Sequence, residues 1–132
     1  MDGGAPTVAD VLAMKERKII AIKESAPLRE AAASLYRNHI GMVVVIGDDN
    51  GFRGVLSERD IIRAFAEKGA EAAPLKVSDI ATHTVRACDP SRTLESVLES
   101  MRNGHFRHMP VVEGGQIRGV ISATDILAFL AR

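Results

Sequence analysis

The chain has 132 residues, 46% of them hydrophobic and 26% charged, and its 17 Lys and Arg residues balance its 17 Asp and Glu residues. This composition predicts a folded globular protein, either one domain or two fused half-domains that share a core, and excludes a disordered chain. The zero net charge and the shortage of aromatic rings (four Phe, one Tyr, no Trp) argue against nucleic acid and an anionic membrane as partners.

The sequence shows neither a membrane-spanning segment nor a signal peptide. No apolar run approaches the roughly 18 residues that cross a bilayer, and the first six residues carry neither the basic nor the apolar segment of a signal peptide. We therefore expect a cytoplasmic protein. The single cysteine, Cys88, cannot by itself form an internal disulfide or a cysteine-based zinc site.

The two halves of the chain resemble each other. Val8–Val11 aligns with Val77–Ile80 at an offset of 69 residues, and from Ser25 onward the offset becomes 66. It then becomes 65, where Arg53–Ile61 and Arg118–Ile126 are identical at six of nine positions. The offset changes in predicted loops, where insertions cost little. This pattern indicates a tandem duplication.

Both repeats carry the same predicted elements. In the first repeat, in chain order, these are a short helix Val8–Met14, a strand Lys18–Ile22, a helix with apolar residues Leu28, Ala31, Ala32 and Leu35, strands Met42–Ile46 and Phe52–Leu56 around the turn Gly47–Gly51, and a helix from Ser57. The apolar spacing i, i+3, i+4, i+7 is that of an amphipathic helix, and Asn-Gly in the turn favours a hairpin.

The second repeat follows the same order. Its predicted elements are a short helix Val77–Ala81, a strand Thr84–Ala87, a helix with Leu94, Val97, Leu98 and Met101, strands His108–Val112 and Gln116–Ile121 around the turn Glu113–Gly115, and a helix from Ser122. Each β-α-β-β-α unit of about 60 residues is too small for an adequate core of its own. We expect two copies packed sheet against sheet: residues 1–6 as a flexible N-terminus, 7–69 and 76–132 as the repeats, and 70–75 as a linker.

One motif recurs at the junction of the last strand and last helix of each repeat. Gly54–Asp60 and Gly119–Asp125 both place a serine before the helix and an aspartate three residues on. Helix capping explains this spacing, because the serine can cap the helix and the aspartate can bond back. An anion site at the helix N-terminus explains it equally, with the serine hydroxyl on a phosphate and the aspartate on a ribose diol. Both interpretations can hold together.

The paired motifs, the element order and the segment His105–Val112 resemble the cystathionine-β-synthase (CBS) domain, and two such repeats in tandem resemble a Bateman module. The resemblance covers the chain from about Thr7 to its end. It implies an α/β fold of the α+β type, with two repeats related by a pseudo-twofold axis, two clefts between small sheets and helices outside. It also implies reversible binding of AMP, ADP, ATP, NAD(H) or S-adenosylmethionine, with no cofactor required.

The resemblance assigns roles to particular positions. For ribose and phosphate it implies Ser57, Arg59, Asp60, Arg107, His108, Ser122, Thr124 and Asp125. For the adenine slot it implies Ile20, Ile22, Val44, Thr82, Val85, Ala87 and Pro110, with Ala81-Thr82 standing where the family often has Met-Thr.

The repeats differ in charge. Arg107-His108 enters a strand in the second repeat, where the first repeat has Gly41-Met42. The resemblance gives the Arg-His pair to phosphate, which suits the donor fork of arginine, whereas a surface arginine and a half-buried histidine are the structural alternative. Arg59 in the first repeat could supply part of the missing positive charge, so we expect two non-equivalent clefts.

Other candidate sites are weaker. His105 and His108 point to opposite faces in an extended segment and have no third metal ligand nearby. The acidic run at Asp48–Gly51 lacks the spacing of a calcium loop and is interpreted as a turn. Cys88 is interpreted as a small buried hydrophobe, since no base can be assigned to it. No metal site and no catalytic constellation are predicted.

The function predicted is a regulatory sensor of an adenosine-containing ligand, without catalysis. The alternative is an interaction module, with partly vestigial clefts, that docks on an enzyme or transporter; a small enzyme that uses the cleft is a third hypothesis. The final helix carries Ile126, Leu127, Phe129 and Leu130, and the helix from Ser57 carries Ile61, Ile62 and Phe65. These apolar stripes are wide enough to serve the core and a partner helix, so we expect a homodimer.

Overall fold

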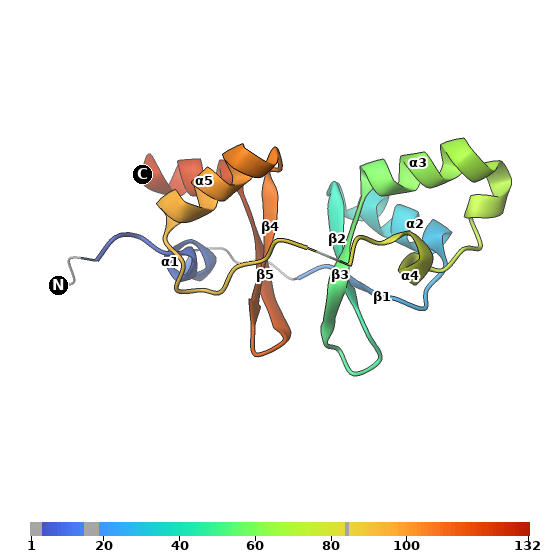
Figure 1. Cartoon of the computed structure of the whole chain (residues 1–132), viewed down its shortest axis with the longest axis horizontal. Coiled ribbons are helices and arrows are strands. Elements are labelled where there is room, and N and C mark those ends of the chain that lie inside the picture. Colours follow the sequence, from blue (N-terminus) through green and yellow to red (C-terminus); the bar gives the residue numbers. More distant parts are fainter. Residues whose placement is uncertain (1–3, 15–18, 84) are drawn as a thin grey trace. The chain divides into compact units, whose positions relative to one another are not determined.

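The computed structural model describes residues 4–14, 19–83 and 85–132, which form two compact units (Figure 1). Unit 1 combines the N-terminal segment up to Ile19 with Arg86–Arg132, and unit 2 comprises Ile20–Val85. The leading helix of each sequence repeat therefore belongs to the unit that contains the other repeat's sheet. No helix in the described part of the chain is long and apolar enough to span a membrane.

Unit 2 is a three-stranded sheet with helices. Its elements are β1 (Ala21–Lys23), α2 (Leu28–Asn38), β2 (Met42–Ile46), β3 (Phe52–Ser57), α3 (Glu58–Lys68), the 3-10 helix η1 (Gly69–Ala72) and α4 (Val77–Ile80). The strand order is β1-β2-β3, with β1 parallel and β3 antiparallel to β2. The periodic residues Leu28, Ala31 and Leu35 of α2 are buried, as the sequence predicts, and pack with Val43 and Val45 of β2 in one core.

Unit 1 is built on a two-stranded hairpin. Its elements are α1 (Val8–Ala13), α5 (Leu94–Gly104), β4 (His108–Glu113), β5 (Gln116–Ser122) and α6 (Ala123–Leu130). β4 and β5 are antiparallel. Its core combines Leu94, Val97 and Met101 of α5 with Met109 of β4 and Ile126 of α6, all at most 4% exposed.

The leading strands depart from prediction. The first strand is β1, Ala21–Lys23, three residues beyond the predicted start at Lys18, which lies outside the described residues. The strand predicted at Thr84–Ala87 is wrong: residues 85–87 are not in a strand, and Thr84 lies outside the described residues. Only Cys88 pairs with Val111, in an isolated parallel bridge.

The course of the chain beyond Cys88 explains why this bridge does not continue into a strand. Beyond Cys88, the carbonyl of Pro90 accepts a hydrogen bond from the Ala9 amide at 2.9 Å, and the Arg92 carbonyl accepts one from Val8 at 2.9 Å. Pro90 also has no amide hydrogen with which to continue a ladder. The segment therefore leaves the hairpin after one paired residue and supplies acceptors to the start of α1.

Both middle helices end in the same way. The residues that follow α2 and α5, His39 and His105, adopt left-handed conformations with φ of 54° and 57°. Two residues later the chain reaches Gly41 in unit 2 and Arg107 in unit 1, just before β2 and β4 begin. The duplication therefore places Gly41 and Arg107 at equivalent backbone positions.

Candidate functional site

In unit 2, the recurring motif forms a capping box at the start of α3. The backbone N–H of Ser57 donates to Oδ2 of Asp60 at 2.9 Å, and the N–H of Asp60 donates to the Ser57 hydroxyl oxygen at 3.1 Å. The other oxygen of Asp60 lies 3.6 Å from a guanidinium nitrogen of Arg63. Asp60 is only 8% exposed. Strand β3 and helix α3 thus hold this carboxylate in one orientation.

The same arrangement recurs at the start of α6 in unit 1. The N–H of Ser122 donates to Oδ2 of Asp125 at 3.0 Å, and the N–H of Asp125 donates to the Ser122 hydroxyl at 3.0 Å. The capping interpretation is therefore confirmed for both motifs. Because the cap orients the serine and aspartate at a helix N-terminus, it is compatible with an anion or ribose site there.

Unit 1 brings its predicted ribose and phosphate residues together. His108 at the start of β4 pairs with Ser122 at the end of β5, and the N–H of Ala123 donates to the Arg107 carbonyl at 2.9 Å. Arg107, His108 and Thr124 are exposed, and Asp125 is half-buried. We call this group the unit 1 motif site: Arg107, His108, Ser122, Thr124 and Asp125.

Unit 2 has the same backbone frame with different side chains. Met42 pairs with Ser57, and the N–H of Glu58 donates to the Gly41 carbonyl at 2.9 Å. Arg59, the predicted source of positive charge, lies exposed in the first turn of α3. We call the group at this junction the unit 2 motif site: Gly41, Ser57, Glu58, Arg59 and Asp60.

The predicted adenine-slot residues of unit 2 lie on different faces of its sheet. Val44 is buried and pairs with Ala21 and Val55, so these three side chains share one face. Ile22 pairs with Val45 and belongs to the helix-side core, against which Ile20 also packs. The structure therefore does not bring Ile20 and Ile22 to the face that carries Val44.

In unit 1 the sheet face equivalent to that of Val44 carries Pro110, which pairs with Val120. Cys88 belongs to the core, and its exposed neighbour Ala87 precedes it in the extended segment beside β4. Cys88 lies opposite Val111 as Ile22 lies opposite Val45, so Ala87 corresponds to Ala21, the residue beside Val44 in unit 2. Sequence reasoning missed Ala21, because hydrophobicity favoured the larger Ile20 and Ile22.

Thr82 pairs with β3 beside the motif glycine, Gly54. It forms an antiparallel bridge with Val55, with hydrogen bonds of 3.0 Å and 2.9 Å between their backbones. A Cβ on Gly54 would lie 2.3 Å from the Thr82 carbonyl oxygen, so only glycine permits this approach. Thr82 is thus fixed against the strand that leads to Ser57. Val85, also predicted for the slot, is half-buried in the same segment.

His83, the residue after Thr82, is held by two backbone carbonyls. Its ring nitrogens Nε2 and Nδ1 lie 3.0 Å from the Ser78 carbonyl and 3.2 Å from the Arg53 carbonyl. These two backbone acceptors, Ser78 foremost, raise the pKa of His83 above its ordinary value because the imidazolium can donate to both.

Comparison with known proteins decides the family. The family model described as CBS domain matches residues 8–67 and 77–132. The chain belongs to the CBS domain family. Both matched segments contain one copy of the Ser-x-x-Asp motif, so each motif site described above lies in one CBS repeat.

Solved CBS proteins share this fold over nearly the whole chain. The CBS-domain containing protein ATU1752 from Agrobacterium tumefaciens is 35% identical, with a TM-score of 0.85 over 97% of this chain and 96% of that one. The CBS domain protein PAE2072 from Pyrobaculum aerophilum, solved in complex with AMP, is 28% identical, with a TM-score of 0.80 over 95% of this chain and 98% of that one.

Curated relatives are longer proteins. The uncharacterized protein MJ1225 from Methanocaldococcus jannaschii is 31% identical over 87% of this chain, which spans 40% of that protein. Arabinose 5-phosphate isomerase KdsD from Escherichia coli is 26% identical over 80% of this chain, which spans 32% of the isomerase. CBS repeats of this type therefore occur both as small proteins and as parts of larger ones.

The remaining candidates have structural explanations. Cys88 is 7% exposed in the core of unit 1, and burial raises the pKa of its thiol, which opposes a nucleophilic role. Oδ1 of Asp49 accepts hydrogen bonds from the Gly51 amide at 2.9 Å and from Arg53 at 3.0 Å, so this carboxylate holds the hairpin turn. Within the described ranges, no three His, Cys, Asp or Glu residues gather as a metal site would require.

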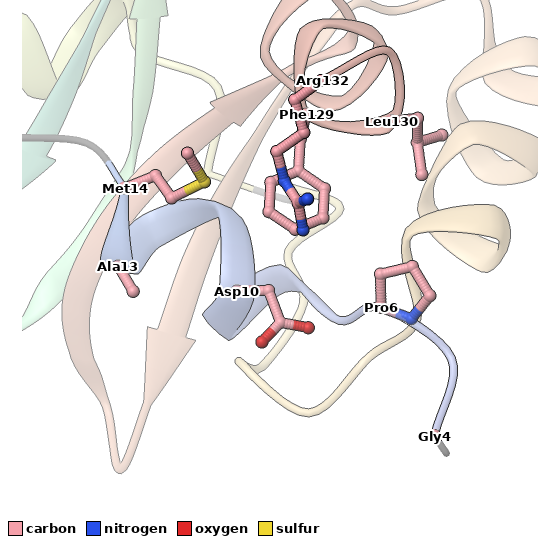
Figure 2. A pocket seen from close by; sticks show the side chains of 8 residues that line it. All are labelled: Gly4, Pro6, Asp10, Ala13, Met14, Phe129, Leu130 and Arg132. Carbon is pink, nitrogen blue, oxygen red and sulfur yellow. The ribbon is translucent and has the colours of Figure 1, made fainter. Parts of the chain in front are cut away.

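A pocket of about 520 Å³ opens in unit 1 between α1 and the end of α6 (Figure 2). None of the predicted site residues lines it. Its polar groups already have partners: Asp10 accepts a hydrogen bond from the Thr7 amide at 2.8 Å, and the Arg132 guanidinium lies 4.0 Å from the centre of the Phe129 ring.

Proposed function

We propose that this CBS-domain protein is a regulatory module that binds adenosine-containing ligands at its motif sites and catalyses no reaction. The observation that carries the proposal is the presence, in both repeats, of a serine and an oriented aspartate at a helix N-terminus. The AMP complex of a structurally similar CBS protein supports the ligand class. The candidates are AMP, ADP, ATP, NAD(H) and S-adenosylmethionine, which share the adenosine half.

The proposal gives each group at a motif site a task. Asp60 and Asp125 accept hydrogen bonds from ribose hydroxyls, and Ser57, Ser122 and Thr124 contact ribose or phosphate. Arg107 and His108 bind phosphate in unit 1. The exposed residues Ala21, Thr82 and Ala87 contact the adenine ring, while Val44 and Pro110 are buried on the same faces as Ala21 and Ala87. Binding would shift the population of module conformations and so signal to a partner.

A regulated partner is the second part of the proposal. The match to one third of an isomerase indicates that such repeats accompany enzymes, so we propose an enzyme or transporter as the partner. Because the proposed ligands are intracellular metabolites, the proposal places the protein in the cytoplasm.

Adenosine ligands should raise the melting temperature. A ligand that binds only the native state stabilises it by RT ln(1 + [L]/Kd), about 2.7 kcal/mol at a hundredfold excess over Kd. For a chain of this size we expect an increase of about 5–12 °C. Differential scanning fluorimetry with millimolar AMP, ADP, ATP, NAD(H) or S-adenosylmethionine measures it, with GTP and UTP as controls. Equal shifts with all nucleotides, or none with any, would favour the docking module instead.

We propose further that the protein is a homodimer. Ile62 on α3 is 66% exposed, and Leu127 and Leu130 on α6 are 55% and 50% exposed, on helices whose other faces fill the unit cores. Such apolar patches mark interaction surfaces. Light scattering at tens of micromolar should give twice the chain mass. The double substitution Ile62→Lys and Leu127→Lys should lower the measured mass to that of one chain. A monomeric parent would contradict this assignment.

A further inference from the structure

The two motif sites offer opposite charges at one equivalent position. In unit 1 the residue before β4 is Arg107, whose carbonyl accepts the first amide of α6 at 2.9 Å. In unit 2 the residue before β2 is Gly41, whose carbonyl accepts the first amide of α3, that of Glu58, at 2.9 Å. The backbone frame is the same, so the side chains can be compared directly.

In unit 2 a carboxylate lies beside the backbone position from which the arginine projects in unit 1. A Cβ placed on Gly41 would lie 3.7 Å from Cδ of Glu58 and 3.8 Å from each of its carboxylate oxygens. The residue equivalent to Glu58 in unit 1 is Ala123, which carries no charge. The exchange of Arg107 and Ala123 for Gly41 and Glu58 therefore changes the local charge by two.

The other charges near this point in unit 2 do not reverse the effect. Asp60 adds a second negative charge, and Arg63 lies 3.6 Å from it as its ion-pair partner. Arg59 is exposed in the first turn of α3, but the three heavy atoms nearest to a Cβ at Gly41 all belong to the Glu58 carboxyl group. A phosphate dianion at the Gly41 position would therefore face the Glu58 carboxylate, where unit 1 offers Arg107.

We propose that the two motif sites select different ligands, with Glu58 as the residue that determines specificity in unit 2. This inference rests on the proposed function. The unit 1 site binds an adenine nucleotide through its phosphate, on Arg107 and His108. The unit 2 site binds an adenosine derivative whose 5′ substituent is uncharged or positively charged, such as a free nucleoside or a sulfonium nucleoside, because Glu58 repels a phosphate and attracts a cation.

Single-site variants separate the two sites. In Asp125→Asn the remaining binding reports on unit 2, and calorimetric titration should show AMP at least about tenfold weaker than adenosine there, since charges a few ångströms apart near a protein surface interact by more than that factor. S-adenosylmethionine should bind at least as tightly as adenosine. In Asp60→Asn the order should be reversed, with AMP preferred, and adding Arg107→Ala should remove this preference.

Glu58→Gln in the Asp125→Asn background tests the assigned residue. AMP affinity should rise by about tenfold while adenosine affinity stays within about twofold. The matched control is Glu67→Gln, which removes the same charge from the exposed far end of α3 and should change neither affinity. The preference for adenosine over AMP should also weaken as salt rises in the Asp125→Asn protein, and it should lose this salt dependence when Glu58→Gln is added.

Two results would overturn the inference and leave the proposed function in place. If AMP binds the Asp125→Asn protein as tightly as adenosine does, or if Glu58→Gln leaves the ratio of the two affinities unchanged, Glu58 does not select the ligand, although the proposed function stands. If the parent protein binds neither adenosine, AMP nor S-adenosylmethionine, the proposed function is wrong and the inference is wrong with it.

Discussion

Asparagine in place of Asp60 or Asp125 should lower the affinity of the corresponding motif site for adenosine at least about tenfold while the protein stays folded. A ribose diol that donates to an oriented carboxylate makes charge-assisted hydrogen bonds, and their loss costs about 1.5–3 kcal/mol of binding free energy. That range corresponds to about 10- to 150-fold in Kd. Isothermal titration calorimetry with adenosine on both single variants and on the double variant measures it.

Capping must be separated from ligand binding in this test, because both carboxylates also accept a serine backbone amide, at 2.9 Å and 3.0 Å. Asparagine keeps an acceptor at this place but loses the favourable charge at the helix start, so we expect a stability loss of about 0.5–1 kcal/mol.

Asp10→Asn is the matched control, since Asp10 accepts the Thr7 amide at 2.8 Å at the start of α1 but belongs to no motif site. It should show a comparable loss of stability with unchanged affinity. If Asp60→Asn and Asp125→Asn also bind like the parent, both carboxylates are helix caps and the ribose assignment is wrong.

The sequence alone predicted most of this architecture. The duplication located both hairpins and both motif helices, since their signals are local: an amphipathic period in Leu28–Leu35, a turn before Phe52, and a capping serine at Ser57 and Ser122. The strand predicted at Thr84–Ala87 was wrong, since the described residues of this segment pair with β4 only at Cys88. The residues around Pro90 bind the start of α1 instead, and local sequence does not encode that choice.

The site was predictable at the motifs and less so at the apolar residues. The hydrophobicity of Ile22 makes it a candidate for an apolar slot, but its pairing with Val45 places its side chain in the core. The smaller Ala21 lies on the other face, beside Val44. A shift of one residue along a strand exchanges its two faces. Glu58 was also missed, because its relation to Gly41 arises only when β2 and the start of α3 come together.

Alanine at Gly54 should destabilise the protein far more than alanine at the equivalent Gly119. At Gly54 the new Cβ would lie 2.3 Å from the Thr82 carbonyl oxygen, a backbone atom held by two hydrogen bonds to Val55. At Gly119 it would lie 2.9 Å from Cδ2 of Leu12, a flexible side chain that can move. We expect a loss of about 2–4 kcal/mol at Gly54, from overpacking and broken backbone hydrogen bonds, and less than about 1 kcal/mol at Gly119.

The two variants also separate the ligand sites. Gly54→Ala must displace Thr82, which the proposed function places against the adenine ring in unit 2, so adenosine binding by the Asp125→Asn protein should fall when this change is added. Gly119→Ala displaces only a side chain of α1, so AMP binding by the Asp60→Asn protein should persist. Urea denaturation and calorimetry measure both effects. Equal stability losses at the two glycines would show that the Thr82 segment yields as easily as Leu12, and Thr82 would then be too loosely held to position a ligand.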